Sequence, residues 1–130
     1  MKIANVVARS LLGVVFVVFG LNGFLQFIKL PPLPGPAVRF LLAMNDTGYL
    51  LPLVMGTELV CGALLLSGYF VPLALTVLTP ILVNIVCFHL YLTSRNNLLP
   101  ATGLLAMHLF LMWQYRRSYK GLFASKGAAS

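Results

Sequence analysis

Four long apolar segments constrain the fold of this chain more than any other feature. The expected spans are residues 5–28, 49–66, 71–92 and 98–115. Each can cross the roughly 30 Å hydrocarbon core of a bilayer as a helix that rises about 1.5 Å per residue. Hydrophobic residues make up 60% of the chain and charged residues only 8%. This composition lies far outside the usual range of soluble domains. The sequence therefore predicts an all-α integral membrane protein, a four-helix antiparallel bundle that forms one transmembrane domain over residues 1–130.

The connections between the spans indicate how the helices follow one another. Only residues 67–70 separate the second and third spans, so these two helices are expected to be antiparallel neighbours. The first connection, residues 29–48, is long and begins with a proline-rich stretch. Within it, residues 37–44 are expected to form a short amphipathic helix at the membrane surface.

Basic residues at the ends of the spans predict the orientation. Four spans place both termini on one side, which carries Lys2, Arg9, Arg116, Arg117, Lys120 and Lys126, against Lys29, Arg39 and Arg95 on the other. The positive-inside rule then puts both termini in the cytoplasm, and we expect the membrane to be the cell (inner) membrane of a bacterium or archaeon. Orientation and contact with anionic lipid explain the net charge of +7, so no nucleic-acid partner is expected.

Glu58 is the only glutamate, and it lies near the centre of the otherwise uncharged segment 49–66. A carboxylate there costs at least about 3 kcal/mol unless it is protonated or paired. Counted from the outer boundary, Asn84 and His108 fall at the same depth, roughly 12–15 Å. Polar groups in a membrane usually face the bundle interior and bond one another, so the three are expected to form one network. Such a network either holds the helices together or forms a proton-accepting or ligand-binding site, with a quinone headgroup as a candidate.

Three further polar residues complete the set of ligand-binding or proton-accepting candidates. Asn22 and His89 are expected within roughly 5–8 Å of the outer surface. Arg9 lies about one turn inside the cytoplasmic boundary, where its side chain either extends outward or turns inward. No metal is expected, because the two histidines differ in depth by roughly 10 Å and no carboxylate-rich set exists. Cys61 and Cys87 are expected to be buried, separate thiols, and the catalytic residues, if any, are unknown from the sequence.

Small residues are spaced for close contact between helices. The first helix carries Arg9, Gly13, Phe16, Gly20 and Phe24 at intervals of four and three, which places them on one stripe. In the second span, Gly56 and Gly62 flank Glu58. Because small residues let another helix approach closely, helix packing is the expected role of Gly13, Gly20, Gly56 and Gly62.

These motifs resemble the DoxX family of four-helix membrane proteins. The likeness covers nearly the whole chain and rests on Arg9-Ser10-Leu11-Leu12-Gly13 through Phe16 to Gly20, and on the stretch from Glu58 to Gly68. The residues that match by position are Arg9, Gly13, Phe16, Gly20, Glu58, Gly62 and Gly68, with His89 as a further candidate. The chain departs from the family where a lysine commonly follows the last glycine of the first motif. Here Phe24 follows Gly23, and the next basic residue is Lys29.

The resemblance implies a small membrane subunit of redox assemblies, such as thiosulfate:quinone oxidoreductase and oxidative-stress complexes. We therefore expect an accessory or anchoring subunit, with quinone as its possible ligand and other proteins of a larger complex and the lipid bilayer as partners. The sequence shows no haem, iron–sulfur or flavin signature, so catalysis by the chain alone is not expected. Two alternatives stay open: a non-catalytic assembly or stability protein of a larger complex, and a carrier for a small solute or proton, which the lack of an internal repeat disfavours.

Overall fold

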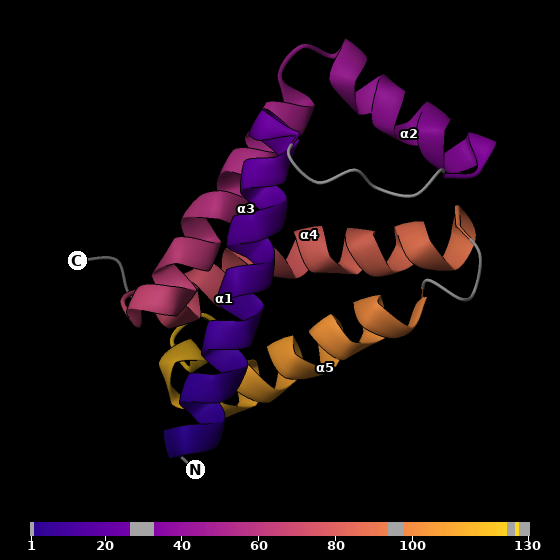
Figure 1. Ribbon diagram of the computed structural model, residues 1–130. Helices are drawn as coiled ribbons and strands as arrows, with labels where there is room; N and C mark the ends of the chain where they lie inside the picture. The colour runs from indigo at the N-terminus through magenta and orange to yellow at the C-terminus, as the bar shows by residue number, and fades with distance from the viewer. Residues whose placement is uncertain (1, 27–32, 94–97, 125–126, 128–130) are drawn as a thin grey trace.

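Helices make up the fold of this protein, for which the computed structural model describes residues 2–26, 33–93, 98–124 and 127 (Figure 1). Within these residues there is no strand, which confirms the predicted all-α class. The helices are α1 (Lys2–Leu25), α2 (Gly35–Asp46), α3 (Leu50–Ser67), α4 (Val71–Tyr91), α5 (Leu98–Gln114) and the one-turn 3₁₀ helix η2 (Arg116–Tyr119). The four predicted spans correspond to α1, α3, α4 and α5. Their ends differ by one residue or a few, and residues 27–28 of the first span lie outside the described part of the chain.

Three of these helices, α1, α3 and α4, are long and apolar enough to cross a membrane. The fourth predicted span, α5, is equally apolar but has only 17 residues. The helices therefore support a bilayer environment for the protein, as predicted from the composition.

A tight turn separates α3 from α4. Gly68 ends α3 with a φ of +82°, a left-handed conformation that glycine adopts without strain. The Ser67 hydroxyl donates to the carbonyl of Leu64 at 2.9 Å and accepts from the Tyr69 N–H at 3.2 Å. Pro72 then occupies the first turn of α4, where its missing N–H costs nothing.

The helices α1 and α3 form the most extensive interhelical contact and run side by side along their lengths (Figure 1). The inner stripe of α1 consists of Ala8, Leu12, Gly13, Phe16, Gly20 and Asn22. The inner face of α3 consists of Glu58, Cys61, Gly62 and Leu65. Of the stripe predicted for the first helix, Gly13, Phe16 and Gly20 are buried, whereas Phe24 is about half exposed.

The pair α4–α5 runs away from α1–α3 instead of lying along it (Figure 1). The buried residues of α4 end at Leu82, while Val83, Leu90 and Tyr91 are exposed. At the opposite end, α5 and η2 are tied to the rest of the molecule. The Tyr115 hydroxyl donates to Asn5 Oδ1 at 3.3 Å and the Tyr119 hydroxyl to the carbonyl of Pro72 at 3.1 Å. A closed antiparallel bundle of four helices is therefore not confirmed, because only the first half of α4 packs closely against the other helices.

The short helix predicted for residues 37–44 is present as α2 and is longer, from Gly35 to Asp46. It contacts α3, and the ring of Phe40 lies 5.7 Å from that of Phe88 in the second half of α4. Ala37 is fully buried. The helix α2 thus bridges α3 and the part of α4 that has left α1–α3.

Candidate functional site

The contact between α1 and α3 brings the two backbones together at three glycines. A Cβ atom at Gly13 would lie 2.9 Å from the carbonyl oxygen of Gly62, and a Cβ atom at Gly62 would lie 2.8 Å from the amide nitrogen of Val17. A Cβ atom at Gly20 would lie 2.8 Å from the amide nitrogen of Leu59. Because all three neighbours are backbone atoms, only glycine fits without moving a helix.

Gly56, the fourth glycine for which a packing role was expected, sits more loosely. A Cβ atom there would meet only the tip of Phe24, at 3.9 Å, which is an ordinary van der Waals contact. Phe24 itself is about half exposed. The approach of one backbone to the other therefore lies between the levels of Gly13 and Gly20, and it does not depend on Gly56.

Arg9 turns inward and meets the C-terminal end of α3. Its Nη1 donates to the carbonyl of Leu65 at 2.9 Å and approaches that of Leu66 at 3.5 Å. A Cβ atom at Gly68 would lie 2.6 Å from the same nitrogen, so the glycine leaves room for the guanidinium. The last carbonyls of a helix carry partial negative charge and lack intrahelical partners, and a cation there satisfies both needs. The Arg9 Nε is buried and has no hydrogen-bond partner among the described residues.

Glu58 lies on the inner face of α3 with only 5% of its surface exposed. Among the described residues its carboxyl group takes part in no hydrogen bond or ion pair. Arg9 is not its partner, because the guanidinium bonds to Leu65, which is about 10 Å further along the helix. Its carboxyl group therefore keeps hydrogen-bonding capacity that no described residue uses.

His108 is buried in α5, with 1% of its surface exposed, and it is bonded to Thr79 of α4. Its Nε2 lies 3.0 Å from the Thr79 hydroxyl oxygen, which in turn donates its single proton to the carbonyl of Leu75 at 2.7 Å. The Thr79 oxygen must then accept from Nε2–H, so a neutral His108 ring keeps Nδ1 as an acceptor. This tautomer is assigned from the hydrogen bonds. Nδ1 is buried and has no partner among the described residues.

The expected network of Glu58, Asn84 and His108 does not form among the described residues. Asn84 is exposed, and His108 bonds to Thr79 instead. The reason is that depth counting assumed four helices with aligned axes, whereas α4 leaves α1–α3 beyond Leu82. Counting from the opposite end of the α4–α5 pair would have placed Thr79 and His108 at about the same level.

The remaining candidates lie apart from one another. Asn22 is buried on α1, with 8% of its surface exposed. His89 is half-buried on α4, where Nδ1–H donates to the carbonyl of Ile85 at 2.8 Å and its ring meets that of Phe88 edge-on. Cys61 is buried as predicted, but the prediction of a buried Cys87 was wrong, because this residue lies on the outward face of the second half of α4. Among the described residues, no three histidine, cysteine or acidic side chains gather closely enough to hold a metal ion.

Comparison with known proteins identifies one family. The DoxX family model matches residues 4–90, which is more than half of the chain and includes α1 to α4 nearly in full. No curated protein and no solved structure matches the chain.

Proposed function

Because the chain belongs to the DoxX family, we propose that this membrane protein is an accessory subunit that anchors or serves a redox complex and interacts with a quinone there. The observation that carries the proposal is Glu58, a buried carboxyl group that makes no hydrogen bond among the described residues. Polar groups are retained inside membrane helices chiefly where they serve a ligand, a proton or a neighbouring helix. The α1–α3 contact is already secured by glycines and by Arg9, so helix pairing does not account for Glu58.

A quinone headgroup suits the hydrogen-bonding groups that the fold leaves unused. A carboxyl group in its protonated form donates to a quinone carbonyl, and an imidazole nitrogen accepts from a quinol hydroxyl. Among the described residues, the Glu58 side chain is 5% exposed and makes no hydrogen bond, and the His108 Nδ1 is buried without a partner. We assign Glu58 to the proposed contact first, because it lies in the motif shared with the family, and keep Asn22, Asn84, His89 and Arg9 as secondary candidates. When bound, the quinone would supply the redox chemistry, and the chain would only hold and orient it.

The partner of this subunit is expected to carry the redox cofactor. In the second half of α4 and in α5, the side chains of Val83, Leu90, Leu99 and Leu109 are about half exposed or more. Figure 1 shows α4–α5 running away from α1–α3, and both pairs of helices carry exposed apolar side chains that could contact a partner. We place the partner against α4–α5 and, by the positive-inside rule, both termini in the cytoplasm.

The test is native mass spectrometry of the protein extracted gently from its own membrane. The proposal predicts that a redox protein and a quinone are carried with the wild-type chain. Glu58→Leu is expected to lose the quinone while keeping the fold, because leucine has a similar volume but can neither donate nor accept a hydrogen bond. Cys61→Ala is the matched control, since it alters a buried residue on the same face of α3 without touching the carboxyl group.

A second function, assembly or stabilisation of a larger complex without any small molecule, is favoured by one specific observation. The family-type residues Arg9, Gly13, Gly20, Gly62 and Gly68 all serve the contact between α1 and α3, which is a packing role. If the extracted protein carries protein partners but no quinone, and Glu58→Leu only alters stability, this second function replaces the first. Transport of a small solute or proton would instead require a water-lined path to Glu58.

A further inference from the structure

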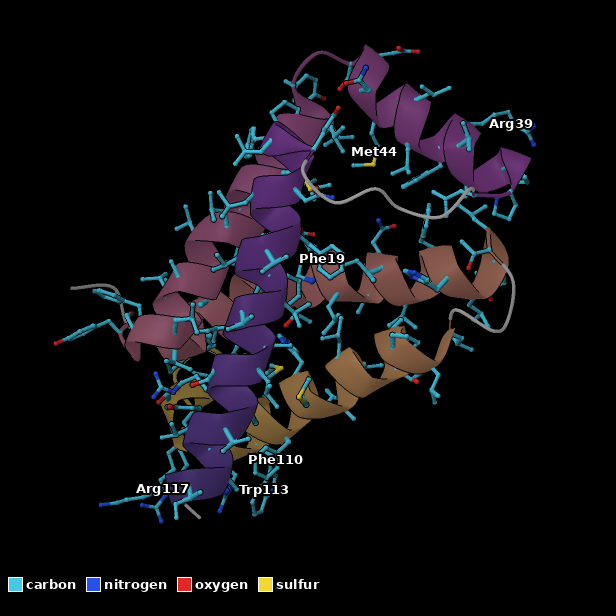
Figure 2. The ribbon with its side chains drawn as sticks, in the orientation of Figure 1. Phe19, Arg39, Met44, Phe110, Trp113 and Arg117 are labelled. Atoms are coloured by element: carbon cyan, nitrogen blue, oxygen red, sulfur yellow. The ribbon has the colours of Figure 1, made fainter. Side chains whose placement is uncertain are left out.

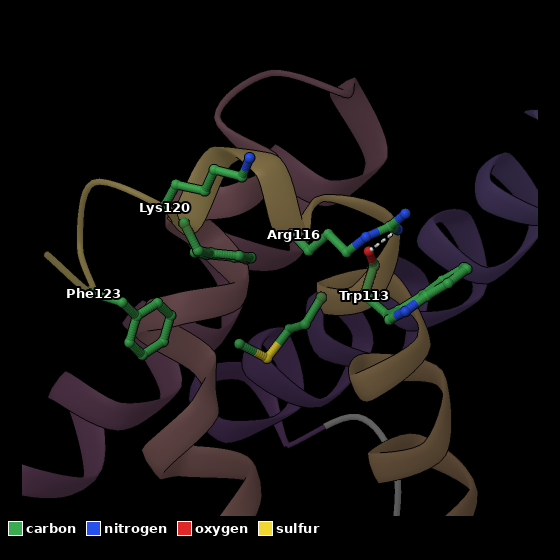
Figure 3. Close-up of a pocket in the computed structure, with 6 residues that line it drawn as sticks. Trp113, Arg116, Lys120 and Phe123 are labelled. Carbon is green, nitrogen blue, oxygen red and sulfur yellow. Dashed lines mark hydrogen bonds between the residues drawn. The ribbon is translucent and has the colours of Figure 1, made fainter.

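An open hollow of about 550 Å³ lies where α5 passes into η2 (Figure 3). Its lining combines two basic residues with an apolar and aromatic surface: Met112, Trp113, Arg116, Tyr119, Lys120 and Phe123. Figure 3 shows the side chains of Arg116 and Lys120 along one rim and that of Phe123 at the far side. This hollow is separate from Glu58 and from the proposed quinone contact, and it belongs to neither.

The walls of the hollow are fixed by hydrogen bonds and ring contacts. The Arg116 guanidinium lies over the Trp113 ring, 4.3 Å from its centre, and Nη1 donates to the Trp113 carbonyl at 2.9 Å. Tyr119 is 6% exposed, and its hydroxyl group holds η2 against Pro72 of α4. A cation held over an aromatic ring keeps its remaining N–H groups available in a set direction. Arg116 is therefore positioned before any ligand arrives.

The charge around the hollow is positive and is not balanced locally. The chain has only two acidic residues, Asp46 and Glu58, and neither lines the hollow. Lys2 and Arg117 lie at the same end of the molecule, where Asn5 of α1 meets Tyr115 (Figure 2 labels Trp113 and Arg117 there). Trp113, Leu122 and Phe123 are more than half exposed, as aromatic and apolar side chains are at the edge of a membrane.

We propose that this hollow is a binding site for an anionic phospholipid. Its phosphate would contact Arg116 and Lys120, and its acyl chains would run along Met112 and Phe123. The ligand must be negatively charged at one end and apolar at the other, because the hollow offers two unbalanced cations next to an apolar wall. A basic side chain near a membrane surface contributes about fivefold to association with anionic lipid, the equivalent of about 1 kcal/mol.

The experiment uses Trp113, the only tryptophan of the chain, as the reporter. The whole protein is placed in phosphatidylcholine vesicles that contain a small, equal fraction of brominated phosphatidylglycerol or brominated phosphatidylcholine. Bromine quenches tryptophan fluorescence at contact, so the difference between the two measures selective binding of the anionic lipid. The proposal predicts stronger quenching by the anionic lipid, a roughly fivefold lower apparent association constant in Lys120→Gln and about 25-fold in Arg116→Gln/Lys120→Gln.

Two controls decide between a built site and general attraction. Lys2→Gln/Arg117→Gln removes the same charge from the same end but leaves the lining intact, so it is expected to keep most of the selectivity. An equal loss in this control, or equal quenching by the two lipids in the wild-type protein, overturns the proposal. Millimolar inorganic phosphate is expected to leave the selectivity for the anionic lipid unchanged. If phosphate abolishes that selectivity, the hollow is a site for free anions. Lys120→Glu, a change at an exposed residue, keeps the test valid if the double variant fails to fold.

Discussion

Replacing Gly20 with alanine tests whether backbone contact between α1 and α3 is the structural centre of this protein. The new Cβ atom would lie 2.8 Å from the Leu59 nitrogen and 2.9 Å from the Met55 oxygen. An ordinary contact needs at least 3.4 Å, so the two helices must separate locally by about 0.6 Å. Both obstructing atoms belong to the backbone, and no side chain can move aside to relieve the clash.

The expected cost follows from the behaviour of overfilled interiors. One extra methyl group in a tight contact typically destabilises by about 1–3 kcal/mol. Alanine also improves helix propensity by up to about 1 kcal/mol over glycine, which partly masks that cost. Gly103→Ala in α5 isolates the propensity term, because nothing lies within 4 Å of a Cβ atom at that position. The difference in free energy of unfolding between the two variants is therefore expected to be about 1–3 kcal/mol.

The assay is unfolding of the purified protein in mild detergent, followed by far-ultraviolet circular dichroism as a denaturing detergent is added. Gly20→Ala is expected to unfold at a clearly lower denaturant fraction than Gly103→Ala, and Gly62→Ala should behave like Gly20→Ala. Gly56→Ala should resemble Gly103→Ala, since its Cβ atom meets only Phe24 at 3.9 Å. Equal stability of the Gly20→Ala and Gly103→Ala variants would refute the claim of backbone contact.

Three further predictions concern hydrogen bonds elsewhere in the fold. Arg9→Met is expected to lower the free energy of unfolding by about 1.5–3 kcal/mol, because the end of α3 loses a charged hydrogen bond, whereas Arg117→Met at an exposed site should change it by less than about 0.5 kcal/mol in the same unfolding assay. Thr79→Val leaves the buried His108 Nε2 unpaired and should lower the free energy of unfolding by about 1–3 kcal/mol. The same change at exposed Thr102 should lower it less. Equal losses in the two variants would contradict the hydrogen bond between Thr79 and His108. Burial raises the pKa of Tyr119 above its ordinary value of 10.0, so the unfolded chain ionises first and stability should fall as the pH rises past 10.0. Unfolding curves of Tyr119→Phe should show a shallower fall over that range, and an unchanged slope would argue against a buried hydroxyl group.

Sequence periodicity predicted the helices and most of the inner stripe of α1, except that Phe24 is about half exposed. Apolar segments of span length and glycines at helical spacing are local signals, and they survive in the structure as α1, α3, α4 and α5. The direction in which α4–α5 leaves α1–α3 is not a local property. It depends on which ends are tied together, here by Tyr115 to Asn5 and by Tyr119 to Pro72.

For the candidate site, the sequence predicted only properties that depend on a single helix. Glu58 is buried as its position in an uncharged span suggested. The partners of the other polar residues required the relative placement of helices, and depth counting with aligned axes paired His108 with the wrong groups. Arg9 illustrates the same limit, since its bond to Leu65 joins residues 56 positions apart.

An electron cryomicroscopy structure of the assembly extracted from its native membrane would test both the α1–α3 contact and the proposed role of Glu58. We expect backbone contact between Gly13 and Gly62, a redox partner against α4–α5, and a quinone within hydrogen-bonding distance of Glu58. A lone chain whose four helices close into a bundle around Glu58, with neither partner nor quinone, would contradict this expectation.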